Sequence, residues 1–127
     1  MAVRAVRGAT RVDVDDRESI LAATRELVAR VLDGNGLQPA DVVSIVFTAT
    51  RDLTAVAPAL AARQLGLHDV ALICAQEMWV EGSMPRVVRL LAHVETTRPR
   101  GQVVNVYLNG TEVLRSDVPA PGKVPAP

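Results

Sequence analysis

Short β-branched runs share this chain with two stretches of helical periodicity, and this mixture constrains the fold more than any other feature of the sequence. The run Val42–Phe47 is almost continuously β-branched, which is typical of a strand buried on both faces. The segment Ala2–Val14 has valines among arginines and is a weaker strand pattern, while Val70–Cys74 is a further short apolar strand. These runs predict three strands of a mixed fold.

The two helical stretches have recognisable ends. Asp15, with Glu18 three residues later, fits a helix-start capping pattern. The apolar stripe that follows ends at Gly34 and has helical spacing: Ile20, Leu21, Thr24, Leu27, Val28, Val31 and Leu32. The alanine-rich stretch Pro58–Leu65, which stops at Gly66, predicts a second helix, and Pro39 favours one short turn between the first helix and the next strand.

The segment Pro85–Glu95 fits a helix and a strand, and we favour the strand. In that register one face is apolar and the other carries Arg89, Leu91, His93 and Glu95. The run Val103–Leu108 alternates in the same way, with Val104, Val106 and Leu108 on one face and Asn105 and Tyr107 on the other. Both Arg89 and Tyr107 therefore lie on mixed faces, where residues that face a cavity belong.

Composition limits the classes of function. Fourteen basic side chains balance fourteen acidic ones, and three aromatic residues offer few stacking platforms, so we expect no nucleic-acid partner. Leu53–Ala62, the longest uncharged stretch of the alanine-rich middle, is far shorter than the ~18–20 residues that span a bilayer, so we expect no membrane partner. Arginines 4, 7 and 11 interrupt the apolar run that a signal peptide needs, which makes the cytoplasm the expected location.

The chain length predicts one domain followed by a tail. With 127 residues the chain can bury one continuous core, and we expect the domain to span residues 1–117. Prolines 119, 121, 125 and 127 preclude regular structure beyond it, so residues 118–127 are predicted to be a mobile tail.

A few polar residues in apolar surroundings are candidates for chemistry. His68, His93 and Cys74 fall at no metal-ligand spacing, so no metal site is expected, and a lone cysteine that ends a strand is ordinarily a buried core thiol. Glu77 is either a solvated loop carboxylate or a site residue. Arg89 either needs an anionic partner or lies on an edge strand in water. Taken individually, the other candidates are ordinary core, surface or solvated residues: Tyr107, Arg51, Arg63 and Arg115.

Several separated motifs occur in order along the chain. They are Arg4-Ala5-Val6-Arg7-Gly8-Ala9-Thr10, Thr48-Ala49-Thr50-Arg51-Asp52-Leu53, Pro58-Ala59-Leu60-Ala61-Ala62-Arg63, Cys74-Ala75-Gln76-Glu77-Met78, Arg86-Val87-Val88-Arg89, Val106-Tyr107-Leu108 and Leu114-Arg115. With these motifs, residues 2–117 resemble the small monofunctional chorismate mutases of the trimeric α/β-barrel class. The resemblance implies an α/β fold, a mixed five-stranded sheet with two helices per chain, and a homotrimer with sites between neighbouring chains.

The resemblance also implies an activity, the rearrangement of chorismate to prephenate without a cofactor, in phenylalanine and tyrosine biosynthesis. Arg89 would reach the ether oxygen of the substrate, and Glu77 would accept its ring hydroxyl. Arg7 and Tyr107 would hold the enolpyruvyl carboxylate. The remaining substrate-binding residues that the resemblance implies are Cys74 near the ring hydroxyl, Arg63 and Arg115 at the mouth, and Ala59 and Leu114.

Two positions depart from the family pattern, and three other functions stay open. Ala57 stands where an aromatic residue is usual, and Leu60 where a lysine is frequent.

The alternatives to a mutase are a trimeric anion-binding module without turnover, an imine-deaminase-like enzyme whose motifs the chain lacks, and a pure assembly protein. The last would leave Arg89 and Glu77 without ligand partners.

Overall fold

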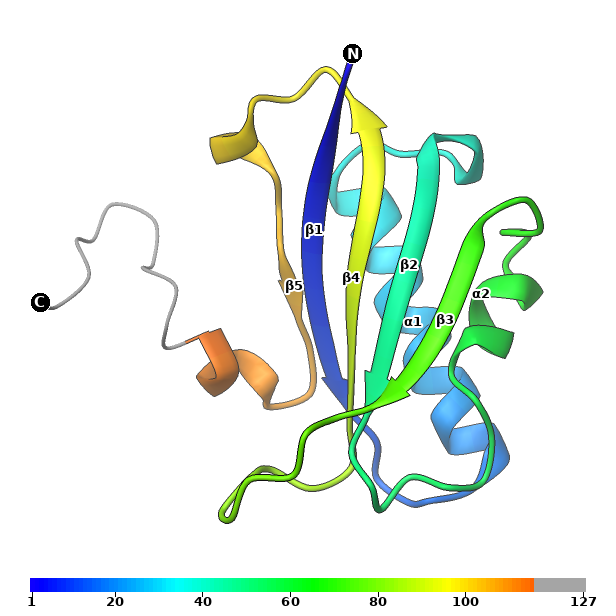
Figure 1. The fold of residues 1–127 in the computed structure, drawn as a ribbon, viewed down its shortest axis with the longest axis vertical. Helices are drawn as coiled ribbons and strands as arrows, with labels where there is room; N and C mark the ends of the chain where they lie inside the picture. Colours follow the sequence, from blue (N-terminus) through cyan, green and yellow to red (C-terminus); the bar gives the residue numbers. More distant parts are fainter. Residues whose placement is uncertain (116–127) are drawn as a thin grey trace, which may run out of the picture.

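A five-stranded sheet with both helices on one face makes up residues 1–115, the part of the chain that the computed structural model describes (Figure 1). The strands follow the order β3-β2-β4-β1-β5 across the sheet. They are β1 (Ala2–Arg11), β2 (Val42–Ala49), β3 (Ala71–Gln76), β4 (Val87–Thr96) and β5 (Val106–Tyr107); the helices are α1 (Arg17–Gly34) and α2 (Ala59–Gln64). The mixed five-stranded sheet with two helices is thus confirmed.

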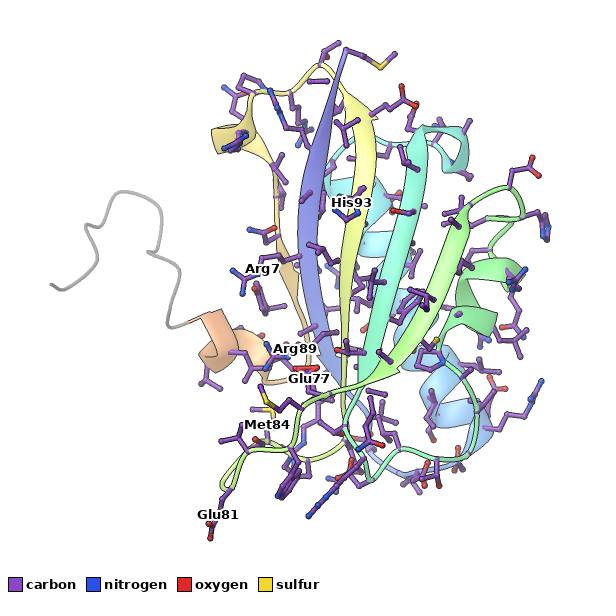
Figure 2. All side chains as sticks on the ribbon, in the orientation of Figure 1. Arg7, Glu77, Glu81, Met84, Arg89 and His93 are labelled. Atoms are coloured by element: carbon purple, nitrogen blue, oxygen red, sulfur yellow. The ribbon has the colours of Figure 1, made fainter. Side chains whose placement is uncertain are left out.

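Strand β4 is the centre of the sheet. It runs antiparallel to β1 and to β2, whereas β2 pairs with β3, and β1 with β5, in parallel. The ambiguous segment Pro85–Glu95 is therefore a strand, as predicted. Its apolar residues Val88, Leu90, Ala92 and Val94 are all buried. The mixed face that carries Arg89 is turned away from the helices (Figure 2).

The core lies between the sheet and α1. The predicted apolar stripe of α1 is buried at Ile20, Leu21, Thr24, Leu27, Val28 and Val31. The hydroxyl of Thr24 is satisfied because it donates to the carbonyl of Ile20 at 2.7 Å. A side chain on Gly8 of β1 would come within 3.1 Å of Leu27 Cδ1, so glycine allows α1 to pack closely on β1.

The last strand is shorter than predicted. The expected strand Val103–Leu108 is reduced to Val106–Tyr107, and Val104 is 43% exposed. Asn35, at the end of α1, explains this: its side chain accepts from the Val104 N–H at 2.8 Å and donates to the Val104 carbonyl at 2.9 Å. The Val104 backbone is therefore satisfied without a strand partner.

The start of α1 differs by one residue from the prediction. Asp16, not Asp15, is the N-cap, and its side chain accepts from the Ser19 N–H at 2.7 Å. Asp15 instead accepts from the backbone N–H and hydroxyl of Thr54 and from the N–H of Ala55. Two adjacent aspartates fit the same capping pattern, so the pattern alone does not distinguish them.

The sheet face opposite the helices is uncovered within one chain. Val46 of β2 pairs with Leu91 of β4 and with Ile73 of β3 on this face, where Ile73 is 61% exposed and Leu91 38%.

Among residues 1–115 no helix has the length and apolar character needed to cross a bilayer. The predicted tail 118–127 and the boundary at residue 117 lie outside the described residues.

Asp15 gives the fold a testable pH dependence. Hydrogen bonds from Thr54, first its backbone N–H and then its hydroxyl, hold the pKa of the Asp15 carboxyl below its ordinary value of 3.8. Such a carboxylate contributes stability above its unfolded-state pKa and loses it as the pH falls through the lower folded-state value. We expect Asp15→Asn to lower the free energy of unfolding at pH 7 and the difference from wild type to shrink below pH 3.8, in urea titrations.

The neighbouring exposed acid offers a matched control. Asp13→Asn removes the same charge two residues earlier and should change stability much less at pH 7. Equal losses for the two variants, or a loss at Asp15 that does not depend on pH, would contradict the role of the Asp15 hydrogen bonds.

Candidate active site

Arg89 lies on the central strand of the sheet. It pairs with Thr48 of β2 on one side and with Ala9 of β1 on the other. The alternative of an edge-strand arginine in water is therefore wrong. The side chain is 37% exposed on the uncovered face. A guanidinium in such a place needs an anionic partner or a ligand.

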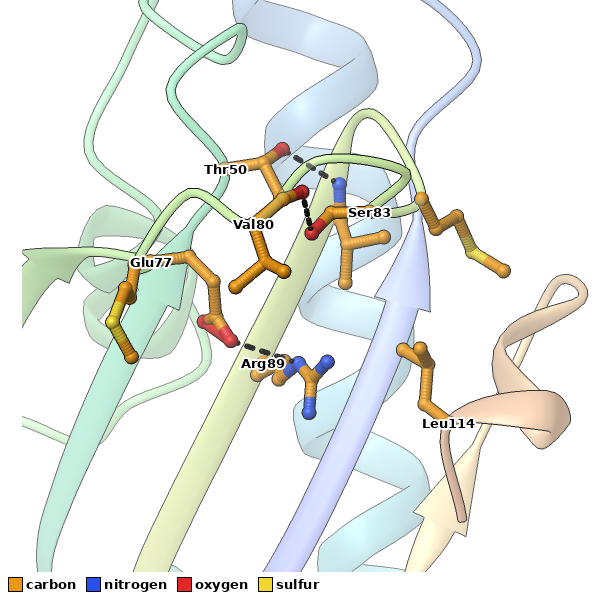
Figure 3. Close-up of a pocket in the computed structure, with 9 residues that line it drawn as sticks. Thr50, Glu77, Val80, Ser83, Arg89 and Leu114 are labelled. Atoms are coloured by element: carbon orange, nitrogen blue, oxygen red, sulfur yellow. Dashed lines mark hydrogen bonds and ion pairs between the residues drawn. The ribbon is translucent and has the colours of Figure 1, made fainter. Parts of the chain in front are cut away.

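Glu77 supplies that partner from the end of β3. Its backbone N–H donates to the Ala49 carbonyl at 2.8 Å, which fixes where the chain leaves the sheet. Its side chain reaches back across β2, so that Oε1 lies 3.1 Å from Arg89 Nε (Figure 3). The other carboxylate oxygen, Oε2, accepts a hydrogen bond from the Thr48 hydroxyl. With 26% of the side chain exposed, Glu77 is not the solvated loop carboxylate of the alternative interpretation.

One donor of Arg89 remains unsatisfied. The Nε atom is buried, and its N–H does not point at the nearby Glu77 oxygen, so the contact is an ion pair without a well-directed hydrogen bond. Among residues 1–115 it is the one buried side-chain nitrogen or oxygen without a hydrogen-bond partner. Buried donors are rarely left unpaired, so this N–H is suited to an acceptor atom of a ligand.

Two adjoining hollows surround the ion pair. One cavity of about 230 Å³ is lined by Thr50, Glu77, Met78, Val80, Ser83, Met84, Val87, Arg89 and Leu114 (Figure 3). The other, of about 320 Å³, is lined by Arg7, Val46, Thr48, Glu77, Arg89, Leu90 and Leu91. The fold thus brings four of the predicted site residues together: Arg7, Glu77, Arg89 and Leu114.

Tyr107 lies in the same row across the sheet. It pairs with Ala9 of β1, which pairs in turn with Arg89, and directly paired residues point to the same face. The expected placement of Tyr107 and Arg89 on mixed faces agrees with this register. Asn105 contributes indirectly, because its side chain accepts from the Arg7 N–H at 2.8 Å and ties β1 to the segment before Tyr107.

Other predicted site residues lie elsewhere in the chain. Cys74 pairs with Phe47, whose side chain is buried toward the helices, and lines a separate cavity of about 290 Å³ together with Arg51, Ala57 and Pro58. The interpretation of Cys74 as a buried thiol is wrong, because β3 is an edge strand and Cys74 is exposed.

The helix α2 carries the next two predicted residues. Ala59 is half-buried and Arg63 is exposed, and neither lines the cavities around Arg89. The side chain of Arg115 lies outside the described part of the chain. A single chain therefore does not bring Cys74, Ala59 or Arg63 to the ion pair.

No pattern in the sequence assigned a role to Thr48. It belongs to a motif that carried the resemblance, yet only the register of β2 against β4 reveals that its hydroxyl holds Glu77. The alternation of β2 is the signal that was available, because Thr48 follows the buried Phe47 and must point to the opposite face.

The arrangement suits an anionic ligand with a hydroxyl group. Arg7 and Arg89 bring two guanidinium groups to the hollows that the carboxylate of Glu77 also lines. Guanidinium groups bind carboxylates through paired N–H donors, and a carboxylate accepts a hydroxyl proton. Within residues 1–115 no three histidine, cysteine or acidic side chains are grouped closely enough to hold a metal ion.

Comparisons with known proteins agree on one family. The model of the protein family described as chorismate mutase type I matches residues 3–118 of this chain. A chorismate mutase of Thermus thermophilus is 46% identical over 117 residues, which cover 91% of this chain and 96% of the relative. A chorismate mutase of Bacillus subtilis is 41% identical over 119 residues, covering 93% and 94%. The solved structure of a chorismate mutase from Clostridium thermocellum superimposes with a TM-score of 0.85 at 41% identity, covering 86% of this chain and 97% of that one.

Proposed function

This chain belongs to the chorismate mutase type I family and is an isomerase that converts chorismate to prephenate, and from that premise we propose that Arg7, Glu77, Arg89 and Tyr107 carry the reaction. The family implies a role in aromatic amino acid biosynthesis. The observation that supports the proposal most directly is the unsatisfied Nε–H of Arg89 beside Glu77. The cytoplasmic location expected from the sequence remains a prediction.

The reaction asks only for positioning and electrostatics. Chorismate rearranges within one molecule: the ether carbon–oxygen bond breaks while a carbon–carbon bond forms, and no proton, nucleophile or cofactor is required. A protein accelerates such a step by holding a near-attack conformer and by stabilising charge that develops in the transition state. Charged groups fixed around a hollow are sufficient for both tasks.

Arg89 and Glu77 would act on the developing charges. As the ether bond breaks, negative charge grows on its oxygen, and the buried Arg89 Nε–H has no hydrogen-bond acceptor within residues 1–115. Glu77 would accept the ring hydroxyl and face the positive charge that develops on the ring. Thr48 would keep the carboxylate in place, because its hydroxyl already donates to one carboxylate oxygen.

Arg7 and Tyr107 would hold the enolpyruvyl carboxylate over the ring. Both lie on strands that pair through Ala9, so their backbones are fixed relative to Arg89. Leu114, which lines the cavity beside Arg89, would cover the apolar side of the substrate. This arrangement would fold the substrate into the conformer that reacts.

The second half of the site is proposed to come from another copy of the chain. Cys74, Ala59 and Arg63 do not reach Arg89 within one chain, and the sheet face that carries Arg89 is uncovered and partly apolar. We propose a homotrimer packed sheet to sheet, in which these residues complete a neighbour's cavity. Arg115 would close its mouth.

The direct test of the function follows chorismate itself. We expect the diene absorbance of chorismate to fall on addition of purified protein, at the same rate with and without EDTA, because no step uses a metal ion. Saturable chorismate binding without turnover would instead support the anion-binding module. Turnover that EDTA abolishes would contradict the mechanism.

The trimer predicts a mass and a dependence of activity on assembly. Sedimentation should give three times the 13.6 kDa mass of the chain. Ile73→Glu places a charge on the uncovered face, outside the two cavities around Arg89, so we expect it to dissociate the trimer and to lower turnover at least tenfold. Val14→Glu, at an exposed apolar residue outside the sheet, is the control and should do neither. A fully active monomer would overturn the assembly.

Arg89 predicts a split between turnover and binding. Its charge meets the ether oxygen only as the transition state forms, so replacing Arg89 with the neutral isostere citrulline should lower kcat by ~10²–10³ and change KM much less. Arg89→Lys should rescue in part, because an ammonium cannot reproduce the placement of the guanidinium. Near-normal kcat in the citrulline variant would show that Arg89 is a ligand clamp rather than a charge stabiliser.

A further inference from the structure

Glu77 begins a loop, residues 77–86, that contains neither helix nor strand. The loop is held firmly at its two ends. Glu77 donates its N–H to Ala49, and Arg86 donates its N–H to both carboxylate oxygens of Asp52 at 3.1 Å and its Nε–H to the Val12 carbonyl. Between these ends the loop has a turn of its own, in which Ser83 donates to Val80 at 2.9 Å. The ends alone do not fix the residues next to Glu77.

Between its two ends, the loop contacts a different segment through Trp79. The guanidinium carbon of Arg51 lies 3.9 Å from the centroid of the Trp79 ring, which is the geometry of a cation–π interaction. Trp79 is the single tryptophan of the chain and is two residues from Glu77. It is 42% exposed, so the contact is not simply part of the core.

The segment that carries Arg51 is a fixed support. Thr50 donates its N–H to the Val87 carbonyl at 3.0 Å, and its hydroxyl donates to Asp52 at 2.5 Å. Three residues after Arg51, Thr54 is held by the Asp15 carboxylate. Arg51 therefore extends from backbone that is anchored to β4 and to the start of α1, and it can fix whatever stacks on it.

From these contacts we propose that Arg51 and Trp79 form a clasp that positions Glu77, a role that rests on the proposed function. Trp79 itself does not line this cavity, but the residues that flank it, Met78 and Val80, line the same cavity as Glu77 and Arg89. Loss of the indole contact would free Met78 and Val80, which form one wall of the cavity, and would let the Glu77 carboxylate move relative to Arg89. Arg51 and Trp79 are positioning residues, because neither lines the cavities around the Arg89–Glu77 ion pair of its own chain.

Steady-state kinetics of five clasp variants test the proposal. Trp79→Leu and Arg51→Met should each lower kcat about twofold to fivefold, the factor that corresponds to an exposed cation–π contact, with KM unchanged within error. The double variant should be no slower than the slower single variant, because the two residues act as one unit. Trp79→Phe and Arg51→Lys keep a ring and a cation and should recover most of the loss.

Two matched controls separate the clasp from general effects. Glu81→Gln changes the tip of the same loop, far from Glu77 (Figure 2), and Arg30→Met removes an arginine from the exposed face of α1. Both should keep the wild-type kcat. The single tryptophan adds a second readout: Arg51→Met should make Trp79 fluorescence more accessible to quenching by acrylamide, whereas Arg30→Met should leave it unchanged.

The outcomes distinguish the clasp from the proposed function. If wild type is active and Arg51→Met exposes the indole without lowering kcat, the clasp does not position Glu77, while the function stands. Independent, multiplicative losses in the double variant would overturn the clasp as well. If wild type has no turnover, the proposed function fails, and unchanged quenching in Arg51→Met would then refute the clasp on its own terms.

Discussion

The ion pair between Arg89 and Glu77 is the contact on which the rest of the site depends. The Arg89 side chain is 37% exposed, yet its Nε is buried on the middle strand of a five-stranded sheet, where an acidic partner offsets the loss of water around the charge. Glu77 does so from the end of β3, two strands away, because β2 between them presents the hydroxyl of Thr48 rather than a bulky side chain. The parallel pairing of β2 with β3 delivers Glu77 to the end of β4 where Arg89 lies.

This geometry also explains why the candidate residues fall into two groups. Residues that pair across β2, β4, β1 and β5 on the uncovered face converge around Arg89. Cys74 points the other way on β3, toward the side that carries α2, where Ala59 and Arg63 lie. A sheet separates side chains on its two faces, so one chain cannot combine both groups. In the proposed sheet-to-sheet trimer, a neighbouring copy would bring its β3 edge, with Cys74 and the adjacent α2, to the rim of the uncovered face.

The sequence predicted those parts of the fold that depend on local periodicity. The stripe of α1 and the alternation in β4 are set by neighbours in sequence, and the alternation placed Arg89 on the correct face. Features set by distant partners were missed. Asn35 satisfies the Val104 backbone, and Asp15 accepts hydrogen bonds from Thr54 instead of capping α1. Cys74 is exposed because β3 is an edge strand. None of these partners is visible from spacing along the chain.

Preorganisation separates Glu77 from the other charged groups of the site. Arg7 and Arg89 project from paired strands, whose hydrogen bonds fix the backbone on both sides. Glu77 lies just beyond a strand, so its carboxylate depends on side-chain contacts for the same precision. Electrostatic stabilisation loses its advantage when a charge must reorganise during the reaction. Three contacts hold Glu77: the Thr48 hydroxyl and the Arg89 guanidinium at its carboxylate, and the Ala49 carbonyl at its backbone N–H. Together they can fix the position of a loop carboxylate as closely as strand pairing fixes a charged group on a strand.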